Sequence, residues 1–550
     1  MRRDLLAIGI IIVIAIIAVA LIFMPPAPTP TPSLTPTTTS SPATTPGKTT
    51  TSSPPPTTTP EKKRPTLVVG VLQNIQNLDP ALTKLSDDAN VYSQIYEGLL
   101  EYDPQTGGLK GCLAESYEVS PDGKVYTFHI RKGVKFHDGT PLNASAVKFS
   151  MERVKEGPGK GYYMDLIEKI EVVDDYTLRV TLKMPFPPFE WLMAGIPKAV
   201  FYITSPSAVK KYGNLTSHPV GTGPYKFVEW VKDDHVTLEA NDDYWKGPPE
   251  FERIVIKIFP DPQTARLALE KGEIDLLYDG LGVTPATDLD YYKSSDKFNM
   301  IPSPKNTIVF LFFWLPDPDR PTANPYLRKA IAHAINYDAI INKLLHGYSL
   351  RPYCYIVPTM KDYYFPVLEK YTYNLTKAKE YIEKSGLKTP IHLVAGYYSR
   401  ATIRRDIFLM MKEDLKEIGI DIEIRSYELS AWMETYTTGA NDIQISAWTA
   451  LYFDPHGFAS FFLNSSIPYP NNAHYYNPEY EQIVMDALKT RDPKERAQLY
   501  KKAWEILAED LPAIPLYTPY TYWITQKYIT GIPENYPLQH MYLGWLKKKA

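Results

Sequence analysis

The residue types that most often do chemistry in proteins occur in this sequence without the spacing that catalysis needs. The chain has no His-Glu-x-x-His, no Gly-x-Ser-x-Gly, no Gly-x4-Gly-Lys-Ser/Thr loop and no Cys-x-x-Cys. A Gly-Thr-Gly at residues 221–223 lacks the further glycine and the lysine of a phosphate loop, so we interpret its glycines as turn residues. Because 62 acidic residues could still supply a pair of carboxylates, the missing motifs alone do not decide against an enzyme.

The bulk composition narrows the class of protein. At 550 residues the chain is too long for one core, so we expect two or three compact units. Its formal net charge of −3 gives no sign of a nucleic-acid partner. Aromatic residues make up 13%, and the 41 tyrosines suit both a core and a binding cleft lined with rings. Cys112 and Cys354 could form one disulfide in an exported protein or stay as two buried thiols, and the sequence favours neither.

The first 65 residues have the composition of an anchor followed by a stalk. Leu5 to Met24 is an uncharged apolar run long enough to cross a bilayer, and Arg2 and Arg3 predict a cytoplasmic N-terminus. No small-x-small cleavage site and no lipobox cysteine follow the run, so we expect residues 1–24 to be an uncleaved anchor and not a signal peptide. Residues 25–65 are almost wholly Thr, Pro and Ser, which predicts an extended stalk, either O-glycosylated or a bare disordered linker.

The stretch from Ala114 to Val154 predicts a strand, a turn and a helix in succession. Val125 to Ile130 alternates its side chains as a half-buried strand does. Pro121-Asp122-Gly123 makes a turn before it, since proline presets φ and glycine accepts φ > 0. Asp138-Gly139 breaks the chain again, and Thr140-Pro141 or Asn143 can then start the helix by capping its free N–H groups.

As a string, this stretch resembles the signature of family 5 of the ABC-transporter solute-binding proteins, the class for peptides, nickel and oligosaccharides. The matching pieces are Ala114 to Tyr117, Asp122 to Gly139 and Val147 to Arg153. Ser145-Ala146 departs from the Glu-Asp pair that usually opens the helix, which removes a capping interaction and leaves the match intact. Further matches are Leu78-Asp79-Pro80, the Val-Gly-Thr-Gly-Pro-Tyr at 220–225 and the Asn-x-x-Tyr-Trp-x-Gly at 241–247.

The resemblance implies an α/β fold of two lobes joined by two crossovers, with a small extra domain inserted in the first lobe. It also implies a receptor that closes over its ligand and delivers it to the permease subunits of an ABC importer, with no cofactor, metal or catalysis. The expected limits are 66–303 for lobe I, about 110–215 for the inserted domain, 304–512 for lobe II and 513–550 for the return to lobe I.

The resemblance also points to charges that this chain lacks. Peptide-binding relatives carry a tryptophan followed three positions later by an aspartate that pairs with the ligand's amino group. Here Trp448 is followed by Leu451 at that position, and Ile445 stands where some relatives have an arginine. Trp314 stands where relatives usually have an asparagine. The usual partners for both ends of a free peptide are therefore missing from these positions.

Rings in place of charges favour a neutral ligand. An indole stacks on the C–H face of a sugar, while amide side chains bind its hydroxyls. We therefore predict an oligosaccharide ligand, with an oligopeptide or dipeptide as the alternative. Core packing is the other interpretation for Trp314 and Trp448, and a turn-forming role for Asp454. The candidate ligand contacts are Gln73, Asn74, Trp230, Trp314, Trp448, Tyr452 and Asp454.

The remaining features favour a monomeric domain outside the cell, held at the membrane by a single-pass anchor. Two other classes stay open: a stalked extracellular hydrolase, and a surface-layer component, against which the signature stretch argues. Asn143 could instead serve only as a helix cap. The candidate glycosylation sites are Asn143, Asn214, Asn374 and Asn464.

Overall fold

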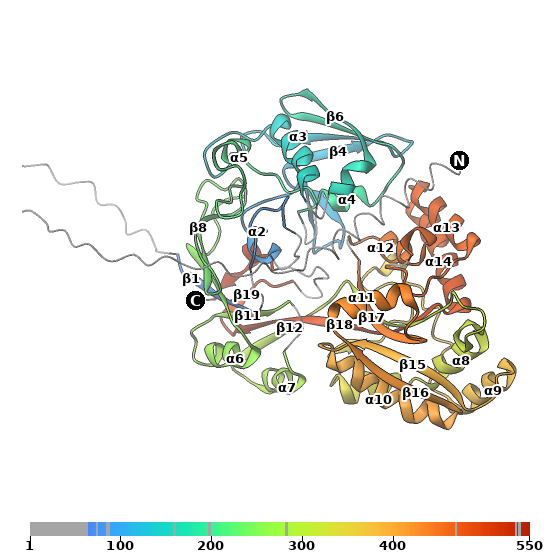
Figure 1. Ribbon diagram of the computed structural model, residues 1–550. Coiled ribbons are helices and arrows are strands. Elements are labelled where there is room, and N and C mark those ends of the chain that lie inside the picture. The colour runs from blue at the N-terminus through green and yellow to red at the C-terminus, as the bar shows by residue number, and fades with distance from the viewer. Residues whose placement is uncertain are drawn as a thin grey trace, which may run out of the picture.

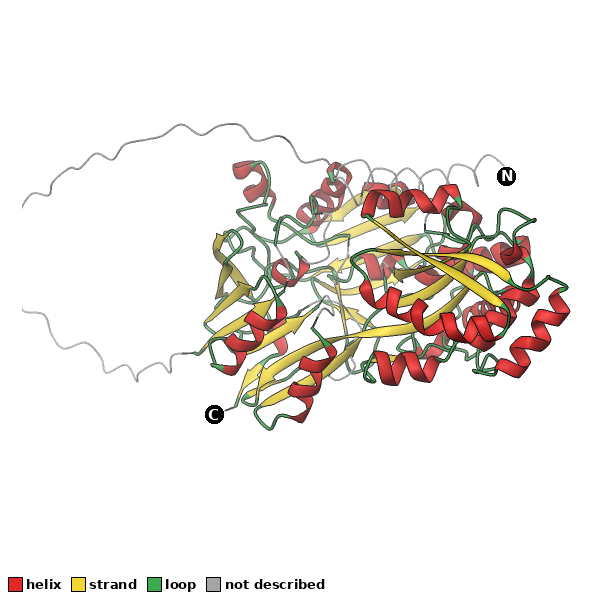
Figure 2. Cartoon of the chain, turned by 60° about the horizontal axis from the view of Figure 1, so that its bottom comes forward, coloured by secondary structure: helices red, strands yellow, loops and turns green. Residues whose placement is uncertain are grey.

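Two large lobes and a smaller domain make up the computed structural model of the chain (Figure 1), and helices cover the sheets in the view of Figure 2. The expected anchor, the stalk and the candidate contacts Gln73 and Asn74 lie outside the described residues. Within the part described, no helix combines the length and apolarity needed to cross a bilayer. The structure describes residues 64–72, 75–83, 88–157, 161–195, 200–280, 284–450, 452–467, 470–533, 536 and 541–549.

One mixed sheet runs through both lobes and contains twelve of the described strands. Ten of them follow the order β16-β15-β17-β13-β18-β11-β1-β10-β9-β8, while β12 and β14 pair with further parts of β18. The strands are β1 Thr66–Val71, β8 Tyr225–Val231, β9 His235–Ala240, β10 Arg253–Ile258, β11 Leu276–Asp279, β12 Phe298–Pro304, β13 Thr307–Phe313, β14 Ser349–Leu350, β15 Ile391–Tyr398, β16 Ile420–Tyr427, β17 Ile443–Thr449 and β18 Ala513–Gln526.

In lobe I, a strand–helix–strand unit sets the direction of the sheet. The pattern of residues 254–277 predicts this unit, and the structure confirms it as β10, α6 (Pro262–Glu270) and β11. Both strands pair in parallel with β1, one on each side. Helix α6 begins where the Asp261 carboxylate accepts the N–H of Thr264 at 2.9 Å, an N-cap that satisfies one of the free donors of its first turn.

The chain crosses between the lobes twice, as the resemblance implies. The first half of β18 pairs with β13 of lobe II, where Phe312 faces Ala513. The second half pairs with β12 and β11 of lobe I, where Phe298 faces Gln526. Only Lys305 and Asn306 separate β12 from β13, so the other crossing lies beside the middle of β18. The lobe limits expected at residues 303–304 and 512–513 stay predictions.

The inserted domain is built around an antiparallel sheet of order β4-β5-β7-β6 with helix α3 packed on it. Strand β5 spans Val125–Ile130 and buries every second residue, as its alternation predicts. Helix α3 starts after Asn143, whose side chain accepts the N–H of Ala146 at 2.9 Å. The elements of this region are β2 Leu100–Tyr102, β3 Leu109–Gly111, β4 Ala114–Val119, β6 Ile167–Asp174, β7 Thr177–Leu182, α3 Ala144–Arg153, α4 Phe189–Leu192 and α5 Pro206–Tyr212.

The helices of lobe II flank its part of the large sheet, with α10 packed on the parallel pair β15 and β16. The remaining elements are α2 Ala89–Tyr92, α7 Ala286–Ser294, α8 Pro325–Ala334, α9 Leu375–Ser385, α10 Thr402–Glu417, α11 Leu429–Thr438, α12 His456–Ala459, α13 Pro478–Lys489, α14 Pro493–Asp510, β19 Ile529–Thr530 and β20 Lys547–Lys548.

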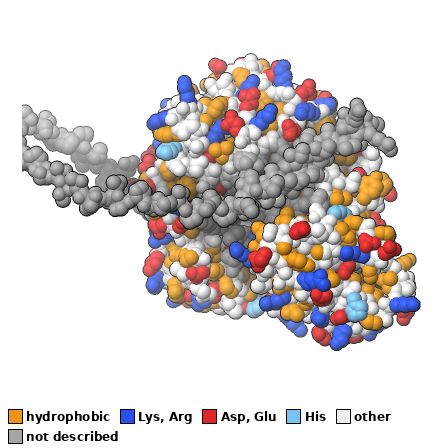
Figure 3. All heavy atoms as spheres, viewed as in Figure 1, with side chains coloured by type: hydrophobic (Ala, Val, Ile, Leu, Met, Phe, Trp, Pro, Cys, Tyr) orange, Lys and Arg blue, Asp and Glu red, His pale blue; other side chains and the backbone are white. Residues whose placement is uncertain are grey.

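The two cysteines do not meet. Cys112 and Cys354 are both buried free thiols, so the disulfide interpretation is wrong and the alternative of two buried thiols holds. Cys112 follows β3, and its Sγ lies 3.5 Å from a carboxylate oxygen of Glu97. On the outer surface, acidic and basic side chains are interspersed over the face in Figure 3. This mixture agrees with a net charge close to zero.

Candidate functional site

A groove of about 660 Å³ lies between the inserted domain and lobe II. Its size falls in the range of small-molecule sites, about 300–1,000 Å³. Both walls contribute polar side chains as well as rings and prolines. The lining residues come from segments 102–108, 123–126 and 185–191 on the side of the inserted domain and from segments 359–363, 453–455 and 490–496 on the side of lobe II.

A buried ion pair forms the floor of the groove. Asp454 and Arg496 make two hydrogen bonds of 2.8 Å, and each side chain is only 6% exposed. Asp454 also accepts the backbone N–H of His456 at 2.9 Å. Burial alone would lower the pKa of the Arg496 guanidinium, but the carboxylate beside it raises that pKa. Asp454 therefore holds the loop after β17 against helix α14, and both of its oxygens are already occupied.

A second carboxylate lies on the opposite wall. Glu190 belongs to the short helix α4, is half-buried and lines the groove. The hydroxyl of Tyr117 donates to it at 2.8 Å. Burial raises the pKa of Glu190, while that hydrogen bond and the charge of Arg491 act in the opposite direction.

Aromatic contacts join the two walls beside the groove. Phe186 of the inserted domain lies edge-on to Tyr452 and His456 of lobe II, with ring centroids 6.1 Å and 5.8 Å apart. The Trp191 ring likewise lies edge-on to that of Phe453, with centroids 5.4 Å apart. All of these rings except that of Trp191 are buried. The inserted domain and lobe II are thus in direct contact beside the groove.

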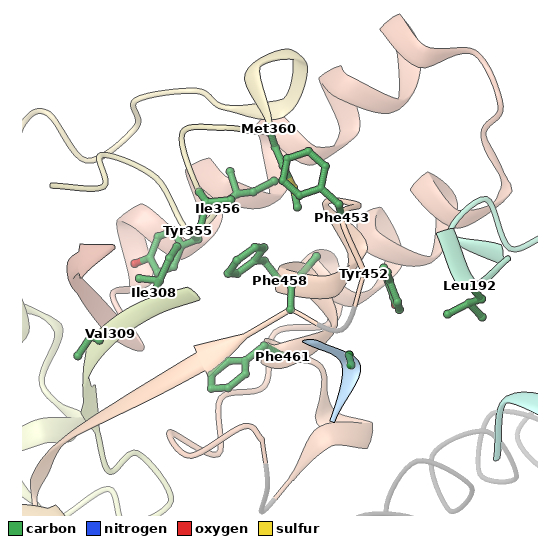
Figure 4. Packing of buried hydrophobic residues seen from close by; sticks show 14 of the residues in the cluster. Leu192, Ile308, Val309, Tyr355, Ile356, Met360, Tyr452, Phe453, Phe458 and Phe461 are labelled. Carbon is green, nitrogen blue, oxygen red and sulfur yellow. The ribbon is translucent and has the colours of Figure 1, made fainter. Parts of the chain in front are cut away.

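Figure 4 shows part of the core on which this wall rests. Phe453 lies beside Met360, and both residues line the groove. Phe458 and Phe461 lie below them in this view and are buried. The loop after β17 is thereby packed on a rigid interior, so its groove-facing residues are held in place.

Of the residues expected to contact a ligand, Asp454 and Tyr452 lie at or beside the groove. Asp454 lines it, and Tyr452 packs against Phe186 next to it. Trp448 is not among the lining residues: its indole N–H donates to the carbonyl of Gly457 at 2.8 Å, and its ring packs on Phe461 at 4.9 Å. Contact of these residues with a ligand stays a prediction.

Trp314 and Trp230 lie elsewhere in the fold. Trp448 lies opposite Ile308 in the β13–β17 pair. Trp314 is six residues after Ile308, just beyond the end of β13, and its backbone N–H donates to the carbonyl of Asp442. At about 3.3 Å per residue, the backbone positions of Trp314 and Trp448 therefore lie about 20 Å apart along the strands. The Trp314 ring instead packs against His474, with centroids 4.5 Å apart. Trp230 belongs to β8, the edge strand of lobe I.

A cation from another element lies close to position 445, where some relatives have an arginine. Arg404, in the first turn of α10, donates from Nη1 to the carbonyl of Ile445 at 3.3 Å. Burial lowers the pKa of Arg404. No carboxylate of the described residues lies within ion-pair distance of its guanidinium. The sequence motif around Trp448 could not predict this contact, because Arg404 lies far from Trp448 along the chain.

Glu190, Arg491 and Arg496 line the groove but were not among the residues expected to contact a ligand. For two of them the sequence pattern contains an indication of a buried or specific contact. Arg496 occupies the apolar face of α14, one turn before Tyr500 and two turns before Trp504, and a charge on such a face indicates a buried partner. Glu190 is the one charged residue in the otherwise apolar segment from Pro185 to Leu192, and a charge in such a segment likewise indicates a specific partner. Arg491 leaves no such signal, since it lies in a polar loop.

The predicted glycosylation sites are mostly exposed, and their use stays a prediction. Asn214, Asn374 and Asn464 are exposed, whereas Asn143 is half-buried. Asn143 and Asn374 both cap helices: the side chain of Asn374 accepts the N–H of Lys377 at 2.9 Å. The capping interpretation of Asn143 is therefore confirmed.

Comparison with known proteins agrees with this architecture. Residues 108–506 match the model of the bacterial extracellular solute-binding proteins, family 5. The chain is 30% identical over 480 residues to a glutathione-binding protein GsiB of Pectobacterium atrosepticum, covering 84% of this chain and 90% of that protein. It is 28% identical over 492 residues to a probable D,D-dipeptide-binding periplasmic protein DdpA of Escherichia coli K12, covering 86% and 93%.

A solved structure shows the same fold. The periplasmic binding protein DppA of Helicobacter pylori, in complex with the peptide STSA, superposes with a TM-score of 0.71 at 28% identity, covering 88% of this chain and 98% of that one. The named relatives are binding proteins of transport systems and not enzymes, which excludes the hydrolase alternative. The chain therefore belongs to family 5 of the extracellular solute-binding proteins.

Proposed function

We propose that this protein, a solute-binding receptor of an ABC importer, captures a short peptide in the groove between its inserted domain and lobe II. The main support is the groove itself, which carries Glu190 on one wall and Arg491 on the other. Carboxylate and guanidinium groups suit the charged ends of a peptide better than the hydroxyls of a sugar. The oligosaccharide was predicted because charged residues are absent near Trp448. In the folded chain, Glu190 and Arg491 from other segments line the groove.

The named relatives support the same class of ligand. Their descriptions name glutathione, a D,D-dipeptide and the peptide STSA as what they bind. Each of these is a short peptide with an amino group and at least one carboxylate. They favour the peptide alternative over the sugar as our main interpretation.

Closure over the ligand would follow from contacts on both sides of the groove. A ligand that touches Glu190 and lobe II together stabilises the closed form relative to the open one. To turn a 1:99 population into 99:1, it must prefer the closed form by about 5.5 kcal/mol. The membrane anchor at residues 1–24, which would keep the receptor near the permease, is part of the same proposal.

Identification of the bound molecule tests this proposal. Mass spectrometry of small molecules released from the purified full-length chain should find peptides of two to five residues. Titration calorimetry with di- to pentapeptides should then give binding, while gluco- and manno-oligomers give no heat of binding. Binding of the sugars alone would overturn the peptide assignment and support the oligosaccharide ligand predicted from the sequence.

A further inference from the structure

A peptide in this groove needs a partner for its amino terminus. The position three residues after Trp448, where the family resemblance implies an aspartate, holds Leu451. An ammonium group taken out of water without an anion pays a large desolvation cost. If the ligand is a peptide, an acid from another part of the chain must therefore meet it.

Three acidic residues line the groove, and their surroundings differ. Asp454 has both oxygens engaged by Arg496. Asp362 is exposed, so water screens its charge. Glu190 is half-buried, and the Tyr117 hydroxyl is the one donor to its carboxylate among the described residues. That bond uses Oε2 and leaves Oε1 available.

The charges around Glu190 leave it able to bind a cation. No lysine, arginine or histidine of the described residues lies within ion-pair distance of it. The groups that act on it from facing elements are Arg491, Asp454 and Arg496, and the last two already neutralise each other. Arg491 is exposed, and its Nη1 donates to the carbonyl of Ser120 at 3.4 Å.

We propose that Glu190 binds the terminal ammonium group of the ligand, in place of the aspartate absent at position 451. The assignment rests on the peptide function proposed above and names the residue that selects for a free amine. Tyr117 orients the carboxylate by its hydrogen bond and leaves the second oxygen for the ligand. Since Glu190 belongs to the inserted domain, the amine would be recognised by the wall that closes over the ligand and not by lobe II.

The assignment predicts how binding depends on pH. Burial raises the pKa of Glu190, so the empty groove loses this charge at a higher pH than a solvated glutamate would. A bound ammonium favours the ionised form. Affinity should therefore be constant at neutral pH and fall as acid protonates Glu190, and the fall should vanish in E190Q.

The experiment compares two libraries of tripeptides, Ala-Xaa-Ala with a free amine and the same peptides N-acetylated, on the full-length chain. Acetylation removes the positive charge and keeps the rest of the ligand. The native protein should bind the free-amine library about tenfold or more tightly than the acetylated one, as expected for loss of a charge-assisted hydrogen bond. E190Q keeps the size of the side chain and an acceptor for Tyr117, and its ratio should fall close to one.

E168Q is the matched control, because it makes the same change at an exposed site on β6 of the inserted domain, outside the groove lining; it should keep the native ratio. A ratio that stays tenfold in E190Q would overturn the role of Glu190 and leave the peptide function standing. A native protein that binds neither library would overturn both. Circular dichroism melting of E190Q, together with the loss of its pH dependence, separates a specific effect from misfolding.

Discussion

Two buried aspartate–arginine pairs, one beneath the inserted domain and one at the groove, share their chemistry and differ in what surrounds them. Asp79 and Arg153 are 0% and 4% exposed, and Asp454 and Arg496 are each 6% exposed. Both pairs are bidentate, the first with a bond of 2.8 Å between Nη1 and Oδ1. Asp79 also accepts the N–H groups of Ala81 and Leu215, so four donors enclose it.

Two ion pairs of the same chemistry thus have different roles in this fold. The first pair ties the loop after β1 to helix α3 and lies away from the groove. The second pair holds the loop after β17 and lines the groove. In both pairs a proline follows the aspartate directly along the chain. Their tertiary surroundings alone separate a purely structural pair from one that also shapes a binding surface.

The largest expected effect comes from breaking the enclosed pair. Arg153→Ala leaves the Asp79 carboxylate buried without its cation, which typically destabilises a protein by about 3–5 kcal/mol. Urea unfolding followed by circular dichroism should show this loss in the free energy of unfolding. Arg425→Ala is the control, because its pair with Glu423 is exposed and screened by water, so its loss should leave the free energy of unfolding nearly unchanged. Equal effects in the two variants would contradict the structural role.

The groove pair should show a second effect that the enclosed pair lacks. Asp454→Asn keeps the shape and removes one charge of a buried pair, so we expect a loss of about 1–3 kcal/mol in stability. Because the loop after β17 lines the groove, peptide affinity should also weaken. Asp79→Asn should destabilise the chain and leave the dissociation constant of the folded protein unchanged. Titration calorimetry on both variants, at a temperature where each is folded, measures the dissociation constants; equal weakening of peptide binding in the two variants would contradict the separate roles of the two pairs.

The smallest expected effect concerns the rings that join the walls. Phe186→Ala removes two edge-on contacts with lobe II, each worth about 0.5–1.5 kcal/mol beyond area burial. The open form should gain population, and peptide affinity should fall about tenfold. Small-angle scattering should show a larger radius of gyration for the unliganded variant. Phe365→Ala, which alters a ring outside the groove lining, serves as control and should leave both quantities unchanged.

Much of the local structure was predictable because it depends on short-range rules. The alternation of residues 125–130 gave a half-buried strand, and Asn143 gave the start of α3, since each depends only on neighbours in the chain. The run at 254–277 likewise gave a strand–helix–strand unit. Long-range pairings could not be predicted where they needed geometry: the sequence left the disulfide and the two free thiols equally open, and the folded chain has two free thiols.

The sequence by itself determined the family, the two-lobed class and the identity of the charged residues, because these are recorded in the order of residues along the chain. The tertiary structure alone decided which charges meet. Glu190 and Asp454 are 264 positions apart and line the same groove. Trp448 belongs to β17 and Trp314 directly follows its partner strand β13, yet the two tryptophans lie at opposite ends of that pair. Electrostatic and packing energies depend on distance and burial, and only the folded chain fixes these.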